Sequence, residues 1–355
     1  MADAIANLIQ GLPVEIGRID RELKRLWQEG EGAATRASLI NFAVYCEGAE
    51  AMRETTGWIA QITQDHACRA ILIGLDPDTA GAEVQACISA HCHLSRAGAK
   101  QVCCEQISFL LGRDGLPLIP NIVFSHLDSD LPLVLWWRGD WPAQSEEQLW
   151  TRVDRLLYDS QTWRQPGDQF QLLRSSIEPA SPHMTLCDLN WTRSLYLRQA
   201  VAQIFDQVEC IEELRGLDAV DIVHAPGMGT TALLFAGWLA AQLQWKPDGA
   251  QSHLLRFLDR GGRAVAVTLR EEPGRALGSV RLSAGERSFL VGHHEGSSYL
   301  HVDIRLSGDR EYHHLMPGGK DELVSLIDDE LMSGGKHKVY LKAVGMIEGV
   351  LGIAG

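Results

Sequence analysis

The hydrophobic pattern of the chain changes at one segment, residues 176–185 (SIEPASPHMT), which has two prolines and no apolar periodicity. Before this segment, short apolar runs typical of buried strands alternate with helical periodicities, which favours an α/β layered structure. After it, strand-like segments separated by turn residues predict a mainly antiparallel sheet, at residues 263–270, 277–283, 287–293 and 299–306. The 355 residues therefore predict two domains: an N-terminal α/β domain over residues 1–176 and a C-terminal α+β domain over residues 185–355.

Hydrophobic periodicity predicts helices and strands on both sides of this boundary. In the first half, the patterns predict strands at residues 38–45, 68–75 and 132–137, a helix at 49–64, a strand pair at 83–94 and 101–109, and a helix carrying Leu149, Val153, Leu156 and Leu157. In the second half, they predict helices at 188–206, 231–244, 320–332 and 338–351, and a strand at 219–225.

The charge balance excludes several classes of partner. The chain has 32 basic and 46 acidic residues, a net charge of −14, and no basic run. Because an acidic protein is repelled by phosphate backbones, we expect no nucleic-acid binding. There is no stretch of 18 apolar residues and no basic, apolar leader, so we expect no membrane span, no export and a cytoplasmic location.

Half of the eight cysteines lie close together, between residues 87 and 104, with His91 and His93 among them. Their C-x4-C and C-C spacings fit no standard zinc pattern. Side chains alternate along a strand, so Cys87 and Cys92 point to opposite faces of a sheet, and Cys103 and Cys104 do the same. We therefore predict no metal site, and nothing else in the sequence indicates a cofactor.

A redox role for two of these cysteines is one of two interpretations that stay open. If residues 83–94 and 101–109 form a hairpin centred near Ala97 and Gly98, Cys92 lies opposite Cys103. Opposed Cβ atoms in such a hairpin are about 4.5–5.5 Å apart, slightly beyond the ideal for a disulfide, and a strained bond there would be labile. Alternatively, these cysteines are small buried hydrophobic residues.

A glycine turn joins the strand 219–225 to the helix that follows, at Gly227, Gly229, Thr230 and Thr231. A turn of this kind can direct backbone N–H groups at a phosphate or carboxylate. The turn lacks the P-loop lysine, however, and Ala232 stands where a dinucleotide-binding fingerprint has its last glycine. Two interpretations stay open: an anion site, and an ordinary helix start.

The segment that ends the strand at 132–137 is unusually rich in tryptophan. It contains Trp136, Trp137, Arg138, Asp140 and Trp141. In open α/β sheets the carboxyl ends of strands are where ligands and partners dock, and tryptophan and arginine dominate interface energetics. We predict that this segment contributes to a partner-binding surface; the alternative is that its tryptophans pack under the sheet.

The sequence contains no complete set of catalytic residues. It has no G-x-S-x-G motif, and no group of residues supplies a nucleophile, a base and an oxyanion hole together. We therefore expect a protein that is not an enzyme.

Several short segments, in order along the chain, resemble the glucose-6-phosphate dehydrogenase assembly protein family, OpcA. They are His91-Cys92-His93, Lys100 to Ile107 (KQVCCEQI), Pro132 to Trp137 (PLVLWW), Asp188 to Arg193 (DLNWTR), Ile204-Phe205-Asp206 and Leu233 to Trp245 (LLFAGWLAAQLQW). The resemblance covers roughly residues 40–250, and its specificity comes from the order of the segments rather than from any one of them.

The resemblance implies a non-catalytic partner of glucose-6-phosphate dehydrogenase that promotes its assembly or its active conformation. Such a protein would direct carbon into the oxidative pentose phosphate pathway and NADPH production. In photosynthetic bacteria the family is associated with redox control through thioredoxin, which would be a second partner. The competing interpretation is a sugar-phosphate-binding protein or enzyme that uses the turn at Gly227–Thr231 as its anion site.

Overall fold

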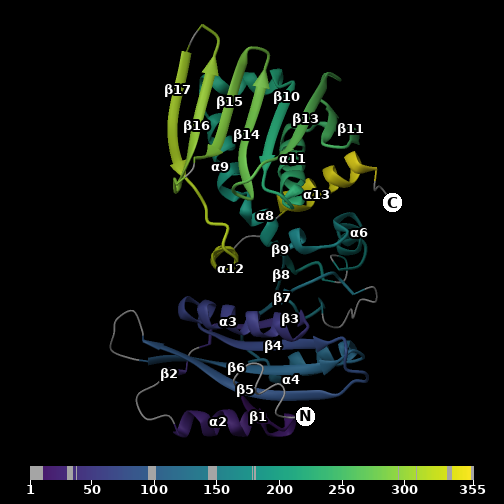
Figure 1. Cartoon of the computed structure of the whole chain (residues 1–355), viewed down its shortest axis with the longest axis vertical. Helices are drawn as coiled ribbons and strands as arrows, with labels where there is room; N and C mark the ends of the chain where they lie inside the picture. Colours follow the sequence, from purple (N-terminus) through teal and green to yellow (C-terminus); the bar gives the residue numbers. More distant parts are fainter. Residues whose placement is uncertain are drawn as a thin grey trace. The chain divides into compact units, whose positions relative to one another are not determined.

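The computed structural model describes residues 11–29, 35–36, 38–94, 101–142, 150–177, 179, 181–294, 296–308, 310–333 and 338–352. The chain forms two compact units (Figure 1). The first unit comprises residues 1–158 and 171–187, and the second comprises residues 159–170 and 188–355. Each unit is built around one large sheet.

The sheet of the first unit has the strand order β1-β5-β6-β4-β3-β7-β8-β9, with β2 paired to β6. The strands are β1 (Leu12–Val14), β2 (Thr35–Arg36), β3 (Ile40–Glu47), β4 (Cys68–Asp76), β5 (Val84–Leu94), β6 (Gln101–Gly112), β7 (Leu133–Trp137), β8 (Arg155–Tyr158) and β9 (Thr185–Asp188). The helices over this part of the chain are α2 (Ile19–Glu29), α3 (Ala49–Asp65), α4 (Ile119–His126) and α6 (Pro166–Leu172). Short helical turns lie at η1 (Ile16–Arg18), η2 (Leu116–Leu118), η3 (Ser160–Thr162) and η4 (Leu173–Ile177).

The central strands of this sheet are parallel, which explains their continuous apolar runs. β4 pairs in parallel with β6 and β3, β3 with β7, and β7 with β8. Parallel strands of this kind are buried on both faces, so they carry little alternation. In β3 the six residues from Asn41 to Cys46 are all buried, and in β7 all five residues are. The helix α3 packs on β3 and β4 (Figure 1).

The sheet of the second unit has the strand order β11-β12-β13-β10-β14-β15-β16-β17. β10 and β13 are parallel, whereas the other neighbours in this order are antiparallel. The strands are β10 (Ala219–His224), β11 (Lys246–Gln251), β12 (Leu254–Leu258), β13 (Ala264–Glu271), β14 (Leu277–Ala284), β15 (Arg287–His293), β16 (Tyr299–Leu306) and β17 (Arg310–Pro317). The helices are α8 (Leu189–Arg193), α9 (Leu195–Ile204), α10 (Val208–Ile211), α11 (Gly229–Leu243), α12 (Leu323–Met332) and α13 (Lys338–Leu351), with the turn η5 (Glu212–Gly216).

The most apolar helix of the second unit, α11, is buried along most of its length and packs against α13. Gly237 makes this packing close, because a Cβ atom there would lie 2.5 Å from the carbonyl oxygen of Ala343. The helix ends at Gln244, which has the left-handed φ of 57° that closes many helices.

These observations confirm the predicted fold class: an α/β layer in the first unit and an α+β unit with a mainly antiparallel sheet in the second. The four strands predicted from residue 263 onward are β13 to β16. The sequence pattern does not predict β17, because nearly all of its residues are exposed and it has no apolar alternation. Among the described residues, no helix has the length and apolar character needed to span a membrane.

Two predicted helices are wrong in detail. The apolar residues after 150 form the strand β8 rather than a helix; Leu156 and Leu157 are both buried, and short apolar runs do not distinguish these two structures. Of the other two residues of that pattern, Val153 is buried in the loop before β8, and Leu149 lies outside the described residues. The single helix expected over residues 188–206 is the end of β9, then α8 and α9, divided at Ser194.

The units also differ from the predicted domain boundary at residues 176–185. Residues 171–187 belong to the first unit, where β9 extends the sheet beside β8. Residues 159–170 belong to the second unit, although they precede the predicted boundary. The chain therefore passes between the units three times, and no composition change marks the first two crossings.

Candidate functional site

The predicted cysteine pair lies on the antiparallel pair β5 and β6. Cys92 is directly opposite Cys103 in the register, their Cα atoms are 4.1 Å apart, and their sulfur atoms are bonded as a disulfide. Cys92 is exposed, whereas Cys103 is 1% exposed. The turn predicted near Ala97 and Gly98 lies outside the described residues. A reductant can therefore approach the bond from the Cys92 side, and its redox role stays a prediction.

The other six cysteines are buried free thiols. Cys68 and Cys104 form a hydrogen-bonded pair on the neighbouring strands β4 and β6; the thiol of Cys68 lowers the pKa of Cys104 to about 7, and the same bond raises the pKa of Cys68. Burial raises the pKa of Cys46 to about 11 and of Cys87 to about 12. Burial keeps these thiols away from solvent, whatever their pKa values. Among the described cysteines, Cys92 is thus the exposed one.

The tryptophans at the end of β7 are core residues. Trp136 and Trp137 are each 2% exposed and Trp141 is 4% exposed. Trp137 stacks on Tyr45 with 3.9 Å between ring centroids, and its ring also lies 5.6 Å from that of Trp150. This burial corrects the expectation that the tryptophan side chains themselves form a contact surface: aromatic packing under the sheet satisfies them.

The two polar residues of the same segment are partly exposed. The guanidinium of Arg138 donates to the carbonyl oxygen of Ala51 at 2.9 Å, pairs with Glu54 at 3.2 Å and lies over the ring of Trp58 at 4.5 Å. The backbone oxygen of Asp140 accepts from the indole N–H of Trp137 at 3.1 Å. Arg138 therefore ties the end of β7 to α3, and the side chains of Arg138 and Asp140 keep a partly exposed surface at this strand end.

The glycine turn before α11 has the backbone expected of a tight turn, with φ of 77° at Gly227. Gly229 begins the helix, and the hydroxyl of Thr231 is buried and donates to the amide oxygen of Asn190. Thr230 is partly exposed. The hydroxyl of Thr231 is therefore already used inside the protein. Of the two threonine hydroxyls in the predicted anion site, that of Thr230 is left to donate to an anion.

A buried polar network, which no sequence motif predicts as a site, surrounds Asp188. One carboxylate oxygen of Asp188 accepts from the backbone N–H groups of Ser160 and Asn190, each at 3.0 Å. The other accepts from the hydroxyl of Tyr340 at 3.1 Å. The side-chain amide of Asn190 donates to the hydroxyl of Ser160 at 3.0 Å and accepts from Thr231. We call Ser160, Asp188, Asn190, Thr231 and Tyr340 the Asp188 network.

Two other residues of the segment Asp188–Arg193 (DLNWTR), namely Thr192 and Arg193, bind further elements of the second unit. Arg193 makes a two-bond ion pair with Asp159, with both distances 2.7 Å, and the hydroxyl of Thr192 donates to Glu330 at 2.5 Å. All four side chains are largely buried. The motif Asp188–Arg193 thus joins the segment 159–170, α11, α12 and α13, which explains why residues 159–170 belong to the second unit. The spacing of DLNWTR indicates a family, but nothing in the sequence indicates these distant partners.

The carboxyl of Asp188 carries an unusual pKa. Burial raises this pKa to about 7, and the nearby charge of Asp159 adds to the increase. In the unfolded chain an aspartate titrates near 3.9. Between about pH 4 and pH 7 the folded protein therefore holds a proton that the unfolded chain releases, so the free energy of unfolding falls as the pH rises across this range.

We expect Asp188→Asn to remove this pH dependence, because asparagine keeps the acceptor oxygen but cannot ionise. Chemical denaturation at pH 5, 6, 7 and 8 measures the effect as the slope of unfolding free energy against pH. The exposed Asp206 provides a matched control as Asp206→Asn. Equal slopes for the wild type and Asp188→Asn would contradict the assignment.

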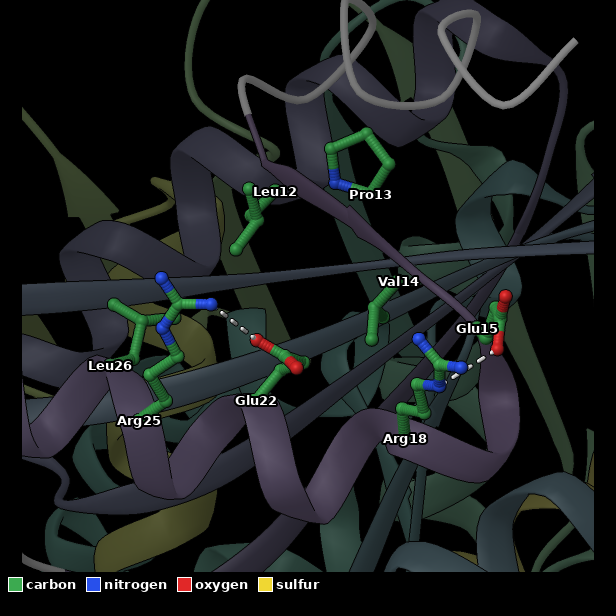
Figure 2. Close-up of a pocket in the computed structure, with 8 residues that line it drawn as sticks. All are labelled: Leu12, Pro13, Val14, Glu15, Arg18, Glu22, Arg25 and Leu26. Carbon is green, nitrogen blue, oxygen red and sulfur yellow. Dashed lines mark ion pairs between the residues drawn. The ribbon is translucent and has the colours of Figure 1, made fainter.

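Two further observations concern ligand sites. A groove of about 500 Å³ lies between β1 and α2, and Figure 2 shows its charged residues paired with each other, Glu15 with Arg18 and Glu22 with Arg25. Within the described parts of the chain, no cluster of three or more histidine, cysteine or acidic side chains is arranged to hold a metal ion.

Comparison with known proteins gives matches over both units. Two family descriptions match, and both are of a glucose-6-phosphate dehydrogenase subunit. The description of its N-terminal domain matches residues 59–175, and the description of its C-terminal domain matches residues 184–344. These are the two domain descriptions of the OpcA family.

Individual relatives agree with the family match. A protein of Nostoc punctiforme, named OpcA and assigned by its name to the OxPP cycle, is 28% identical over 62% of this chain and 49% of its own length. Its namesake in Synechocystis sp. is 29% identical over 64% of this chain and 50% of its own length. The chain thus spans about half the length of the curated relatives it matches.

Solved structures resemble the chain only distantly. An oxidoreductase from Bacillus cereus has a TM-score of 0.48 and 9% identity, covering 87% of this chain and 95% of its own. UDP-N-acetylglucosamine 3-dehydrogenase GnnA from Acidithiobacillus ferrooxidans has a TM-score of 0.45 and 10% identity, covering 88% and 96%. Neither likeness bears on activity. The two family descriptions together match most of the chain, one on each side of the predicted boundary, and the chain belongs to the OpcA family.

Proposed function

We propose that this protein binds glucose-6-phosphate dehydrogenase and supports its active form without catalysing a reaction itself. The observation that carries the proposal is the match of both family descriptions, which name the dehydrogenase, to the two parts of the chain. The relatives' assignment to the OxPP cycle agrees with it. The protein would thereby promote the oxidative pentose phosphate pathway and NADPH production, in the cytoplasm.

An activator must bind the active form of its partner more tightly than the inactive form. A tenfold increase in substrate affinity needs a coupling free energy of about 1.4 kcal/mol. The proposed contact at the end of β7 is made by the exposed parts of Arg138, whose guanidinium lies over the rings of Trp58 and Trp136, and of Asp140, whose backbone oxygen accepts from Trp137.

The disulfide between Cys92 and Cys103 is the proposed redox-sensitive element. Thiolate attack by a dithiol reductant of the thioredoxin class on the exposed sulfur of Cys92 would form a mixed disulfide and release the Cys103 thiolate, which then takes up a proton. The second thiol of the reductant would then free Cys92 and leave the reductant oxidised. Reduction removes the covalent link between β5 and β6 close to where β2 pairs with β6.

The test titrates glucose-6-phosphate dehydrogenase from the same organism with glucose 6-phosphate, with and without this protein, after reduction or oxidation. We expect a lower apparent KM or a higher kcat in the presence of the protein, and a difference between the two redox states. The redox difference should disappear in Cys92→Ser and persist in Cys210→Ser, which replaces a buried free thiol.

The two parts of the proposal fail separately. Unchanged kinetics together with no co-elution of the two proteins would overturn the dehydrogenase interaction. Equal activation by the reduced and the oxidised protein, with thiol counts that verify the two states, would overturn the redox role and leave the interaction standing.

A further inference from the structure

The sheet of the second unit has one buried face and one accessible face. The helix α9 packs on β15 and β16, and α11 packs on β10 and β13. The inward residues of the central strands are all buried: Val220, Ile222, Val280, Leu282, Phe289, Val291, Leu300, Val302 and Ile304. The outward residues, which alternate with these, are mostly half-buried or exposed.

One line of outward residues crosses five strands in register, one residue from each. From β10 to β17 the register places Asp221 opposite Arg281, Arg281 opposite Leu290, Leu290 opposite Asp303, and Asp303 opposite His313. We call these five residues the central row. In order, these side chains are acidic, basic, apolar, acidic and an imidazole. If a second row lies over the first in the opposite order, each acidic residue therefore faces a basic residue or a histidine, and leucine faces leucine.

The contacts within this row leave charge available for a partner. His313 is hydrogen-bonded to Asp303 at 2.7 Å, and Asp221 has Arg270 at 4.0 Å. Arg281 is exposed, and within the described residues no carboxylate lies in ion-pair distance of it. Arg281, Leu290, Asp303 and His313 line a shallow hollow of about 190 Å³.

On β14 and β15 the row is flanked on both sides by small residues. Ser283 and Ser288 lie on one side, and Ser279 and Gly292 lie on the other. Gly292 is required there, because a Cβ atom would lie 2.8 Å from that of Ser279. Two sheet faces can stack at about 10 Å with strands nearly aligned.

We propose that this face binds the same face of a second copy of the chain, about a two-fold axis that lies midway between the two faces, parallel to β15 and directly over Leu290. Such an axis reverses the order of strands between the two copies, so Leu290 meets Leu290. Arg281 then lies over Asp303 of the second copy, and Asp221 lies over His313 of the second copy. A symmetric contact of this type makes each pairing twice.

The adjoining positions on the side of Ser279 and Gly292 fit the same arrangement. Val223 of β10 and Leu315 of β17 lie at equal numbers of strands on either side of β15, so the axis places one over the other and pairs two apolar side chains. Leu315 is 64% exposed in the single chain, which a second copy would cover. Ser279 lies over His301 in the same way, and Gly292 over Gly292.

The test measures the mass of the full chain by sedimentation equilibrium over a range of concentrations. We expect a dimer for the wild type. Arg281→Glu and Asp303→Arg each place like charges opposite each other twice, so each should weaken the dimer by about 100-fold or more. An equal mixture of the two variants should restore dimers, because in the mixed pair both contacts join opposite charges. Arg260→Glu makes the same charge change in an exposed turn and should leave the dimer intact.

Misfolding of a single variant could also abolish its dimer. The mixture separates the two causes, because the dimer can return only if both variant chains are folded. A wild type that stays monomeric would overturn it, and so would single variants that dimerise normally or a mixture that stays monomeric. If the single variants instead lose binding to the dehydrogenase while the wild type is a monomer, the face belongs to that partner and the self-association is wrong. The inference does not rest on the proposed function.

Discussion

Replacing Arg193 with methionine is expected to lower the free energy of unfolding of the second unit by about 3–5 kcal/mol, which is the usual cost of removing one partner of a buried ion pair. The two side chains of the pair, Arg193 and Asp159, are only 8% and 11% exposed. Arg193→Met leaves the carboxylate of Asp159 buried without its cation, beside Asp188, whose pKa its charge already raises. Denaturation followed by circular dichroism measures the loss.

Hydrogen exchange localises this effect and provides its control. We expect faster exchange in residues 159–170 and 188–204, because Arg193 holds these segments together through Asp159. The double variant Asp159→Asn with Arg193→Met removes both charges and should be less destabilised than the sum of its single variants. A strictly additive double variant would show that the ion pair does not stabilise the second unit.

Trp137→Ala is expected to lower the free energy of unfolding of the first unit by about 3–5 kcal/mol, as large-to-small core substitutions do. Trp137 is 2% exposed and contacts the rings of Tyr45, Trp141 and Trp150. The substitution therefore leaves a cavity in an aromatic cluster. Thermal unfolding of the purified variant measures the loss.

The control for Trp137→Ala separates packing from partner binding. Asp140→Lys changes the charge at the same strand end, where the side chain is partly exposed, and should leave the unfolding free energy within about 0.5 kcal/mol of the wild type. If Asp140→Lys lowers dehydrogenase binding without loss of stability, the strand end is part of the interface. A Trp137→Ala variant as stable as the wild type would contradict the core role.

Local sequence patterns predict strands well where buried and exposed residues alternate along the strand. The outward and inward residues of β13 to β16 alternate, and the sequence predicts each of these strands within a few residues of its bounds. It does not predict β17, an edge strand whose residues are nearly all exposed. It predicts a helix in place of β8, because four residues are too few to establish a period.

The candidate sites divide in the same way. The opposition of Cys92 and Cys103 depends only on the register of one hairpin, which the sequence predicts from its two strands and the turn between them. The environment of Trp136, Trp137 and Trp141 depends on what packs over them, and a run of tryptophans has the same pattern whether it faces solvent or Tyr45. The sequence therefore leaves two interpretations open, and the burial of these side chains decides between them.

The sequence by itself indicated the family, the class of each sheet and the position of Cys92 opposite Cys103, because these depend on local periodicity and on the order of short motifs; the disulfide between the two cysteines is seen only in the structure. Tertiary structure alone decided the domain composition and the buried polar network. Asp188 meets Ser160, 28 residues before it, and Tyr340, 152 residues after it. Contacts at such separations leave no periodic signal, because each partner is chosen by the packing of whole elements rather than by its neighbours in the chain.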